Sequence, residues 1–209
     1  NEACPESSST VTITIYETFS SGAPLSATPA MFCESGLPSS FDLFSLLDGT
    51  QDPNGQWTLG ATVISNPSAI DLTGLAASGT PYDYTYTQNV APNPCLEEST
   101  TVQVVVLTNP NAGTPVPQFP EFCVSDITTG QTVNLFDLLD GTQDTNGTWY
   151  EGPDTSGTGT IVPNSVDISS FAENTYDFTY SVPDIGSCSD ADVTVSIIIN
   201  DTLAPNASP

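Results

Sequence analysis

The sequence predicts an all-β chain of tandem antiparallel β-sandwich domains in an elongated array, and three observations carry this prediction. Long segments recur at a period of about ninety residues. Short runs alternate apolar and polar residues, which is typical of half-buried strands. The 18 prolines and 15 glycines punctuate these runs, and such punctuation favours turns between short strands.

The recurrence is the strongest of the three observations. Residues 32–57 recur as residues 122–149, and both copies hold the string LLDGTQD, an Asn-Gly pair and a tryptophan. Trp57 and Trp149 are 92 residues apart (149 − 57). This period is too long for a solenoid unit and fits a small independent domain.

The recurring segments divide the chain into four parts. Residues 93–107 recur as residues 186–199, and a third copy opens the chain at residues 2–16. We therefore expect the last strand of a preceding repeat, two complete repeats, and a linker to a further repeat. These parts are residues 1–19, 20–109, 110–200 and 201–209.

Alternation within each repeat indicates strands with an aromatic inner face. The aromatic positions are Tyr82, Tyr84 and Tyr86 in the first copy, and Tyr176, Phe178 and Tyr180 in the second. Beta-branched runs predict further strands at residues 11–15, 102–107 and 193–199. We expect no helix beyond single turns at Leu43–Leu47 and Leu135–Leu139. About seven short strands with one buried tryptophan in about 90 residues predict an immunoglobulin-like (Ig-like) sandwich.

The charge composition excludes several classes of function. The chain has no Lys, Arg or His, and its 25 Asp and Glu residues give a net charge of −25. The histidine-based catalytic arrangements cannot be built, and neighbouring carboxylates in one turn do not flank a sugar as glycosidases require. We therefore expect no enzyme. Nucleic acid and anionic membrane surfaces are repelled, and no apolar run is long enough for membrane insertion.

The same composition indicates an extracellular location. The uncompensated carboxylates need external cations, and trypsin-like proteases find no basic residue to cleave. Prolines between the repeats, at positions 110, 115, 117 and 120, predict a semi-rigid spacer.

The order of these motifs resembles a known family. Each repeat has a cysteine, then an NLFDLL-like string, the DGTQD loop, Asn-Gly and a tryptophan. An aromatic strand and a second cysteine before a TVxV strand follow. This order is similar to the tandem Ig-like repeats of giant Bacteroidetes cell-surface adhesins, such as the SprB-type gliding adhesins. The resemblance implies a surface filament that is exported by type IX secretion and acts in gliding motility.

The DGTQD loops are the candidate metal site. Short oxygen ligands beside glycines suit Ca²⁺, and the same residues suit metal-free tight turns. The spacing is not that of an EF-hand. No cofactor is required, and Ca²⁺ is the one we consider. The candidate ligands are Asp48, Asp52, Asn54, Asp140, Asp144 and Asn146.

The five cysteines allow two disulfide patterns, and sequence does not decide between them. Pairing within repeats joins Cys33 to Cys95 and Cys123 to Cys188, and leaves Cys4 for an upstream partner. Pairing across the linkers joins Cys4 to Cys33 and Cys95 to Cys123. We favour the first pattern, because closing loops of more than sixty residues stabilises a small domain by about 4 kcal/mol.

The functional expectation is a structural and adhesive segment of a bacterial surface filament. Its partners are neighbouring repeats and an external surface or polysaccharide. Two alternatives remain. The segment Thr10–Thr18 serves as a donor strand in a pilus-like fibre, or the chain is a carbohydrate-binding module with exposed aromatic residues. We expect Trp57 and Trp149 in the core. Thr202 lies in a motif that resembles Bacteroidetes O-glycosylation sites.

Overall fold

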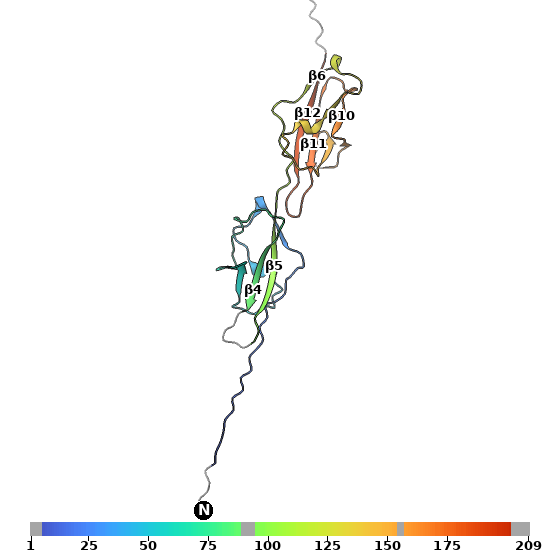
Figure 1. Cartoon of the computed structure of the whole chain (residues 1–209). Helices are drawn as coiled ribbons and strands as arrows, with labels where there is room; N and C mark the ends of the chain where they lie inside the picture. Colours follow the sequence, from blue (N-terminus) through green and yellow to red (C-terminus); the bar gives the residue numbers. More distant parts are fainter. Residues whose placement is uncertain (1–5, 89–94, 154–156, 202–209) are drawn as a thin grey trace, which may run out of the picture. The chain divides into compact units, whose positions relative to one another are not determined.

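The described part of the chain is built from β-strands and short 3-10 turns (Figure 1). The structure is a computed structural model, and it describes residues 6–88, 95–153 and 157–201. Within these ranges no helix is long and apolar enough to cross a membrane. The predicted all-β class is confirmed.

The first repeat forms a five-stranded sheet with the strand order β1-β5-β4-β2-β3. Strands β4 and β5 form its centre, where Tyr84 pairs with Val102 in an antiparallel register. Alternate residues of β5 are buried, as the alternating pattern predicts. The strands are β1 (Ala30–Cys33), β2 (Gln56–Leu59), β3 (Thr62–Val63), β4 (Tyr82–Gln88) and β5 (Glu98–Leu107).

The second repeat forms a five-stranded sheet with the corresponding order, β6-β12-β11-β8-β9. Strand β6 pairs with β12 in parallel, and the other pairs in this sheet are antiparallel. A separate two-stranded sheet joins β7 to β10. The strands are β6 (Glu121–Cys123), β7 (Thr132–Asn134), β8 (Thr148–Glu151), β9 (Ile161–Val162), β10 (Ser165–Asp167), β11 (Asn174–Val182) and β12 (Ala191–Asn200).

The second repeat is a sandwich, because its core draws side chains from both sheets. Val166 of β10 lies in one buried cluster with Trp149 of β8 and Val195 of β12. In the first repeat an antiparallel bridge between Phe41 and Ile70 takes the place of the β7–β10 pair. A two-layer packing with the tryptophan on an early strand of the larger sheet is the Ig-like arrangement that the sequence predicts.

The two expected helical turns are present as 3-10 turns, η2 (Leu43–Leu46) and η4 (Leu135–Leu138). An Asx side chain begins each turn: the carboxylate of Asp42 accepts from the N–H of Phe44, and the amide oxygen of Asn134 accepts from the N–H of Phe136. Such side-chain caps satisfy backbone donors that the turn itself leaves unpaired. Leu43 and Leu135 are thereby held in the two cores.

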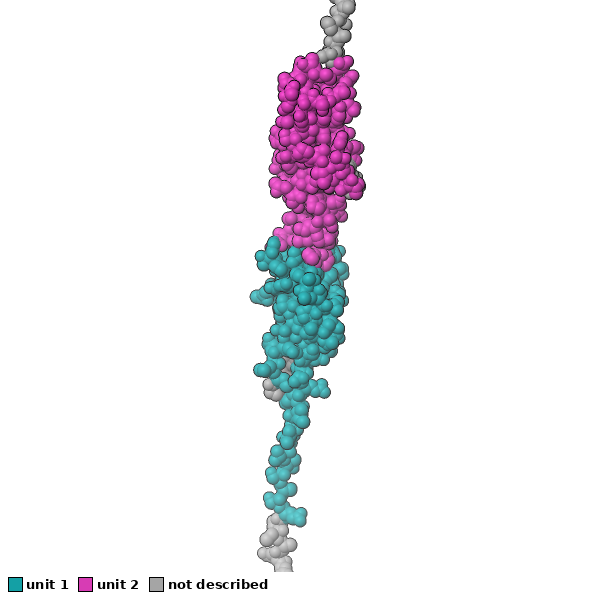
Figure 2. Space-filling model, turned by 90° about the vertical axis from the view of Figure 1, so that its right-hand side faces the viewer, with its two compact units in different colours: residues 1–30, 37–75, 79–105 teal, residues 31–36, 76–78, 106–209 magenta. Residues whose placement is uncertain are grey.

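The chain divides into two compact units, coloured separately in Figure 2. Unit 1 consists of residues 1–30, 37–75 and 79–105. Unit 2 consists of residues 31–36, 76–78 and 106–209. Three short segments that the sequence assigns to the first repeat therefore belong to unit 2, namely residues 31–36, 76–78 and 106–109. The segment 31–36 includes Cys33 and the 3-10 turn η1 (Glu34–Gly36).

Part of the segment that we expected to act as a spacer belongs to the fold of unit 2. Pro115 forms an antiparallel bridge with Leu139. The carbonyl oxygen of Pro120 accepts a hydrogen bond from the N–H of Ile198 in β12 (3.1 Å). Because proline lacks an N–H, it suits such edge positions, where only its carbonyl is needed.

Candidate functional site

The DGTQD loops, which hold the candidate metal ligands, fasten the start of each repeat to its body. In the first copy the Asp48 carboxylate accepts hydrogen bonds from the N–H of Thr50 (3.0 Å) and the N–H of Ala23 (3.2 Å). In the second copy the Asp140 carboxylate accepts from the hydroxyls of Thr114 (2.5 Å) and Thr142 (2.8 Å). In both repeats the first aspartate of the DGTQD loop therefore binds the segment that leads into the repeat, which we call the incoming segment.

The second aspartate of each loop makes a reciprocal pair with the incoming segment. The Asp52 carboxylate accepts from the N–H of Ser20, and the Asp52 N–H donates to the Ser20 carbonyl, both at 2.8 Å. Asp144 and Asn111 form the same two bonds at 2.9 and 2.8 Å. This duplicated geometry gives the aspartates a structural task that explains their presence in both copies.

The two asparagines of the metal set occupy turns beside these aspartates. Asn54 has a φ of 71°, in the left-handed region that asparagine tolerates better than most residues. Asn146 is exposed next to Gly147. In the described ranges no group of three or more Cys, Asp or Glu residues lies close enough to hold a metal ion. Calcium binding by the six candidate ligands stays a prediction.

Hydrogen bonding holds the pKa of two loop carboxylates below its ordinary value of 3.8. For Asp48 the largest cause is the N–H of Thr50, and for Asp140 it is the hydroxyl of Thr114. Donors directed at a carboxylate favour its charged form. Both side chains are fully exposed, so solvent weakens the effect on stability.

We expect the loss of stability caused by the Asp140→Asn substitution to depend on pH. Because the folded pKa is depressed, the stabilisation by the charged form is present above about pH 4 and is lost as the pH falls through the folded pKa. The loss of stability in Asp140→Asn, relative to the natural chain, should therefore shrink below pH 4. Urea unfolding between pH 7 and pH 3 measures this difference.

The matched control for this prediction is Asp184→Asn, which removes an exposed carboxylate from the same unit. Both variants relieve the repulsion within a chain of net charge −25 by one unit. A pH dependence of equal size in both variants would contradict a specific role for Asp140.

A tyrosine hydroxyl links each loop to the core, which sequence reasoning did not predict. The Tyr86 hydroxyl donates to the carbonyl of Asp52 (2.6 Å) and accepts from the N–H of Gly55 (2.9 Å). Tyr180 makes the same bonds in the second copy, with Asp144 (2.7 Å) and Gly147 (2.9 Å). The signal available in the sequence is the joint recurrence of the Asn-Gly pair and the last aromatic residue of each stripe.

The two tryptophans are core residues, as expected. Trp57 is 1% exposed and Trp149 is 3% exposed. Phe44 meets the Trp57 ring edge-on at a centroid distance of 5.6 Å, and Phe136 meets Trp149 in the same way at 5.6 Å. Edge-to-face contact is favourable between aromatic rings.

The aromatic stripes are also turned inward. Tyr84, Tyr86, Phe178 and Tyr180 are at most 3% exposed, and Tyr82 and Tyr176 are half-buried. A sugar-stacking platform requires exposed ring faces. The carbohydrate-binding alternative is therefore wrong in the form that relied on these residues.

The structure corrects the disulfide pattern that we favoured. Cys33 is bonded to Cys188, with their Cα atoms 5.0 Å apart. This bond is incompatible with the Cys33–Cys95 and Cys123–Cys188 pairs, and equally with a Cys4–Cys33 pair. Cys123 is exposed and has a free thiol. Cys4 and Thr202 lie outside the described residues.

The physical reason for the correction is the position of the segment 31–36. Cys33 ends β1, and this end of β1 is part of unit 2. Cys188 lies in unit 2 in a tight turn, where its N–H donates to the carbonyl of Ile185 (2.9 Å). Loop-length reasoning compares residues within a repeat, whereas a disulfide forms only where Cα atoms approach within about 7 Å.

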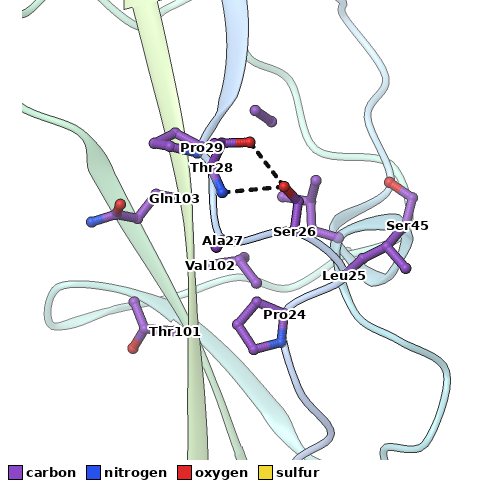
Figure 3. Close-up of a pocket in the computed structure, with 12 residues that line it drawn as sticks. Pro24, Leu25, Ser26, Ala27, Thr28, Pro29, Ser45, Thr101, Val102 and Gln103 are labelled. Carbon is purple, nitrogen blue, oxygen red and sulfur yellow. Dashed lines mark hydrogen bonds between the residues drawn. The ribbon is translucent and has the colours of Figure 1, made fainter.

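Unit 1 contains a pocket of about 360 Å³ (Figure 3). Its walls are the segment Pro24–Ala30, two residues of η2, and Thr101, Val102 and Gln103 of β5. The Ser26 hydroxyl forms a hydrogen bond with the hydroxyl of Thr28 (2.8 Å), so these two polar groups of the wall bind each other. None of the twelve lining residues has an ionisable side chain, so this pocket offers no acid, base or charged anchor.

The N-terminal segment presents an exposed apolar row. Val11, Ile13 and Ile15 are 82%, 83% and 90% exposed, and residues 6–20 form no assigned strand. The corresponding residues of β5, which are Val102, Val104 and Val106, are at most 4% exposed. The segment therefore has the sequence of a core strand without the covering that a core strand requires.

Comparison with known proteins leaves the family open. No protein-family model matches the chain, and no curated protein matches it. Among solved structures the chain is similar to Sidekick-1 immunoglobulin domains 1-4, with 10% identity and a TM-score of 0.28. The similarity covers 91% of this chain and 54% of that one, so the chain spans about half the length of that structure. At this TM-score the similarity adds no argument to the fold described above.

Proposed function

We propose that this chain is a segment of a long extracellular filament on a bacterial surface, built from Ig-like repeats in series. Its role is structural and adhesive. The observation that carries the proposal is the exposed row Val11, Ile13 and Ile15, which repeats the sequence of a buried strand. Burial of one such side chain is worth about 1.5–3 kcal/mol. A preceding repeat that uses this segment as its last strand covers all three.

The charge and the disulfide support the same proposal. A chain with 25 carboxylates and no basic side chain suits water rich in cations. The Cys33–Cys188 disulfide is compatible with an oxidising, extracellular compartment. The resemblance to Bacteroidetes adhesins extends the proposal to type IX secretion and gliding motility. The adhesive target, a surface or a polysaccharide, belongs to the same proposal.

A second candidate function uses the same exposed row in another way. If separate subunits assemble, the segment Thr10–Thr18 completes the sandwich of a neighbouring subunit by strand addition. The exposed row favours this pilus-like fibre as much as it favours a single long chain.

Denaturing electrophoresis under reducing conditions distinguishes the two candidates. Reduction is needed because disulfides would otherwise join separate chains. The proposed filament gives one very large polypeptide from native material. A single band near the mass of this chain would contradict the filament and support subunit assembly.

We expect cations to stabilise both units, because nothing within the chain offsets its net charge of −25. Sodium chloride should raise the melting midpoint progressively as it screens the carboxylates. If the DGTQD loops bind Ca²⁺, calcium at matched ionic strength raises the midpoint further, and a chelator removes that increment. Calorimetry measures these midpoints, and the Asp48→Asn variant should lose part of the calcium increment. Equal midpoints in sodium and calcium salts would contradict calcium binding.

A further inference from the structure

The Cys33–Cys188 disulfide joins two defined places in the fold. Cys33 is the last residue of β1, the edge strand beside β5. Cys188 ends a tight turn between β11 and β12, in which Gly186 has a φ of 59°. A Cβ atom added at Gly186 would lie 2.7 Å from Leu107 and 3.5 Å from the sulfur of Met31. The turn is thus seated beside the end of β1, within unit 2.

Cys123 occupies the place in the second sheet that Cys33 occupies in the first. It is the last residue of β6, the edge strand beside β12. A 3-10 turn follows each cysteine directly, η1 (Glu34–Gly36) after Cys33 and η3 (Val124–Asp126) after Cys123. Cys33 carries a disulfide, whereas Cys123 is exposed with a free thiol.

Cys188, the cysteine of this turn, also has counterparts elsewhere in the chain. Cys188 lies three residues before the start of β12 at Ala191 (191 − 188). Cys95 lies three residues before the start of β5 at Glu98 (98 − 95). Cys4 precedes the third copy of this strand sequence. Each copy of the repeat therefore has one cysteine ahead of its last strand sequence, which we call the turn cysteine after Cys188, and each complete repeat has one edge-strand cysteine.

We propose that Cys123 forms a disulfide with the turn cysteine of a further copy of this repeat, as Cys33 does with Cys188. This inference rests on the proposed function, in which repeats follow one another. Every edge-strand cysteine then bonds to the turn cysteine of the next repeat. The filament would carry a covalent cross-link at each step in addition to its backbone.

The chemistry is thiol–disulfide exchange with a small disulfide such as oxidised glutathione. The Cys123 thiolate attacks this oxidant, forms a mixed disulfide and releases one glutathione thiolate. The turn-cysteine thiolate then attacks the Cys123 sulfur and releases the second glutathione thiolate. Two protein thiols are oxidised to one disulfide, and the oxidant is reduced to two thiols.

The surroundings of Cys123 differ from those of Cys33. Beside Cys33 the turn rests on Met31 and Leu107. Beside Cys123 the strand ends are polar, because the Asn200 side-chain amide donates to the carboxylate of Glu121 (3.3 Å). The turn of a further copy would therefore meet an amide and a carboxylate beside Cys123, where the turn beside Cys33 meets Met31 and Leu107.

The test is disulfide mapping on the full chain and on a chain lengthened by one repeat. In the lengthened chain, residues 110–209 are duplicated at the C-terminal end, so that a further turn cysteine follows Cys123. Both are oxidised in a glutathione redox buffer and cleaved with a protease specific for acidic or aromatic residues. We expect Cys33–Cys188 in both chains. In the lengthened chain we also expect Cys123 joined to the added copy of Cys188.

In the full chain alone, oxidation at high concentration should give disulfide-linked multimers. Their linked peptides should join Cys123 to Cys95 or Cys4 of a second molecule. The Cys123→Ser variant should abolish these multimers and keep the Cys33–Cys188 bond. Symmetric Cys123–Cys123 dimers, or a Cys123 thiol that stays free in the lengthened chain, would overturn the inference.

The disulfide test and the electrophoresis that tests the proposed function can fail independently. A very large native polypeptide with a free Cys123 thiol would contradict only the cross-link. A small native subunit with Cys123 joined to a turn cysteine of another molecule would contradict only the single long chain.

Discussion

Replacing Gly55 by alanine is expected to lower the unfolding free energy of unit 1 by about 3 kcal/mol. The added Cβ would lie 2.7 Å from the Cε2 atom of Tyr86, whose ring is fully buried and packed against Phe44 and Trp57. Overpacking of this kind costs about 1–3 kcal/mol. Displacement of the Tyr86 ring by the added Cβ would also break the hydrogen bond from the Gly55 N–H to the Tyr86 hydroxyl, which is worth about 1 kcal/mol.

The matched control is Gly74→Ala in the same unit. A Cβ atom at Gly74 meets no atom within 4 Å, so this substitution should change stability by less than about 0.5 kcal/mol. Urea unfolding followed by tryptophan fluorescence measures both variants. If Gly55→Ala is as stable as Gly74→Ala, the tyrosine does not anchor the DGTQD loop as the structure indicates.

Removing the disulfide by Cys33→Ser is expected to lower the unfolding free energy of unit 2 by about 2–4 kcal/mol. The bond closes a loop with a sequence separation of 155 residues, for which the chain-entropy model gives about 5 kcal/mol. The smaller value is expected because much of that loop belongs to unit 1. Residues that fold separately shorten the loop that is free in unfolded unit 2.

The control for this prediction is Cys123→Ser, which removes a cysteine that carries no disulfide in this chain. A Trp57→Phe background leaves Trp149 of unit 2 as the fluorescent reporter of urea unfolding. The Cys123→Ser variant should match its background, and a reducing agent should bring the background to the level of Cys33→Ser. Equal stability of both serine variants in the absence of reductant would contradict a stabilising disulfide.

Local patterns in the sequence predicted the features that depend on neighbouring residues. The alternation around Tyr84 and Tyr180 predicted the central strands, because a strand exposes every second side chain to the core. The leucine-rich strings predicted the 3-10 turns, and the duplicated tryptophans predicted the aromatic centres of both repeats. The recurrence at about ninety residues predicted two similar Ig-like sheets. These are the properties that the sequence by itself determined.

Only the tertiary structure decided which distant residues meet. The disulfide joins Cys33 to Cys188, and the carboxylates of Asp48 and Asp140 accept hydrogen bonds from the incoming segments. Each outcome depends on contacts between residues far apart in the chain, and residue spacing does not encode such distances. The aspartates illustrate the reason: the same oxygen-rich loop suits a cation or backbone N–H donors, and the position of the incoming segment supplies the donors.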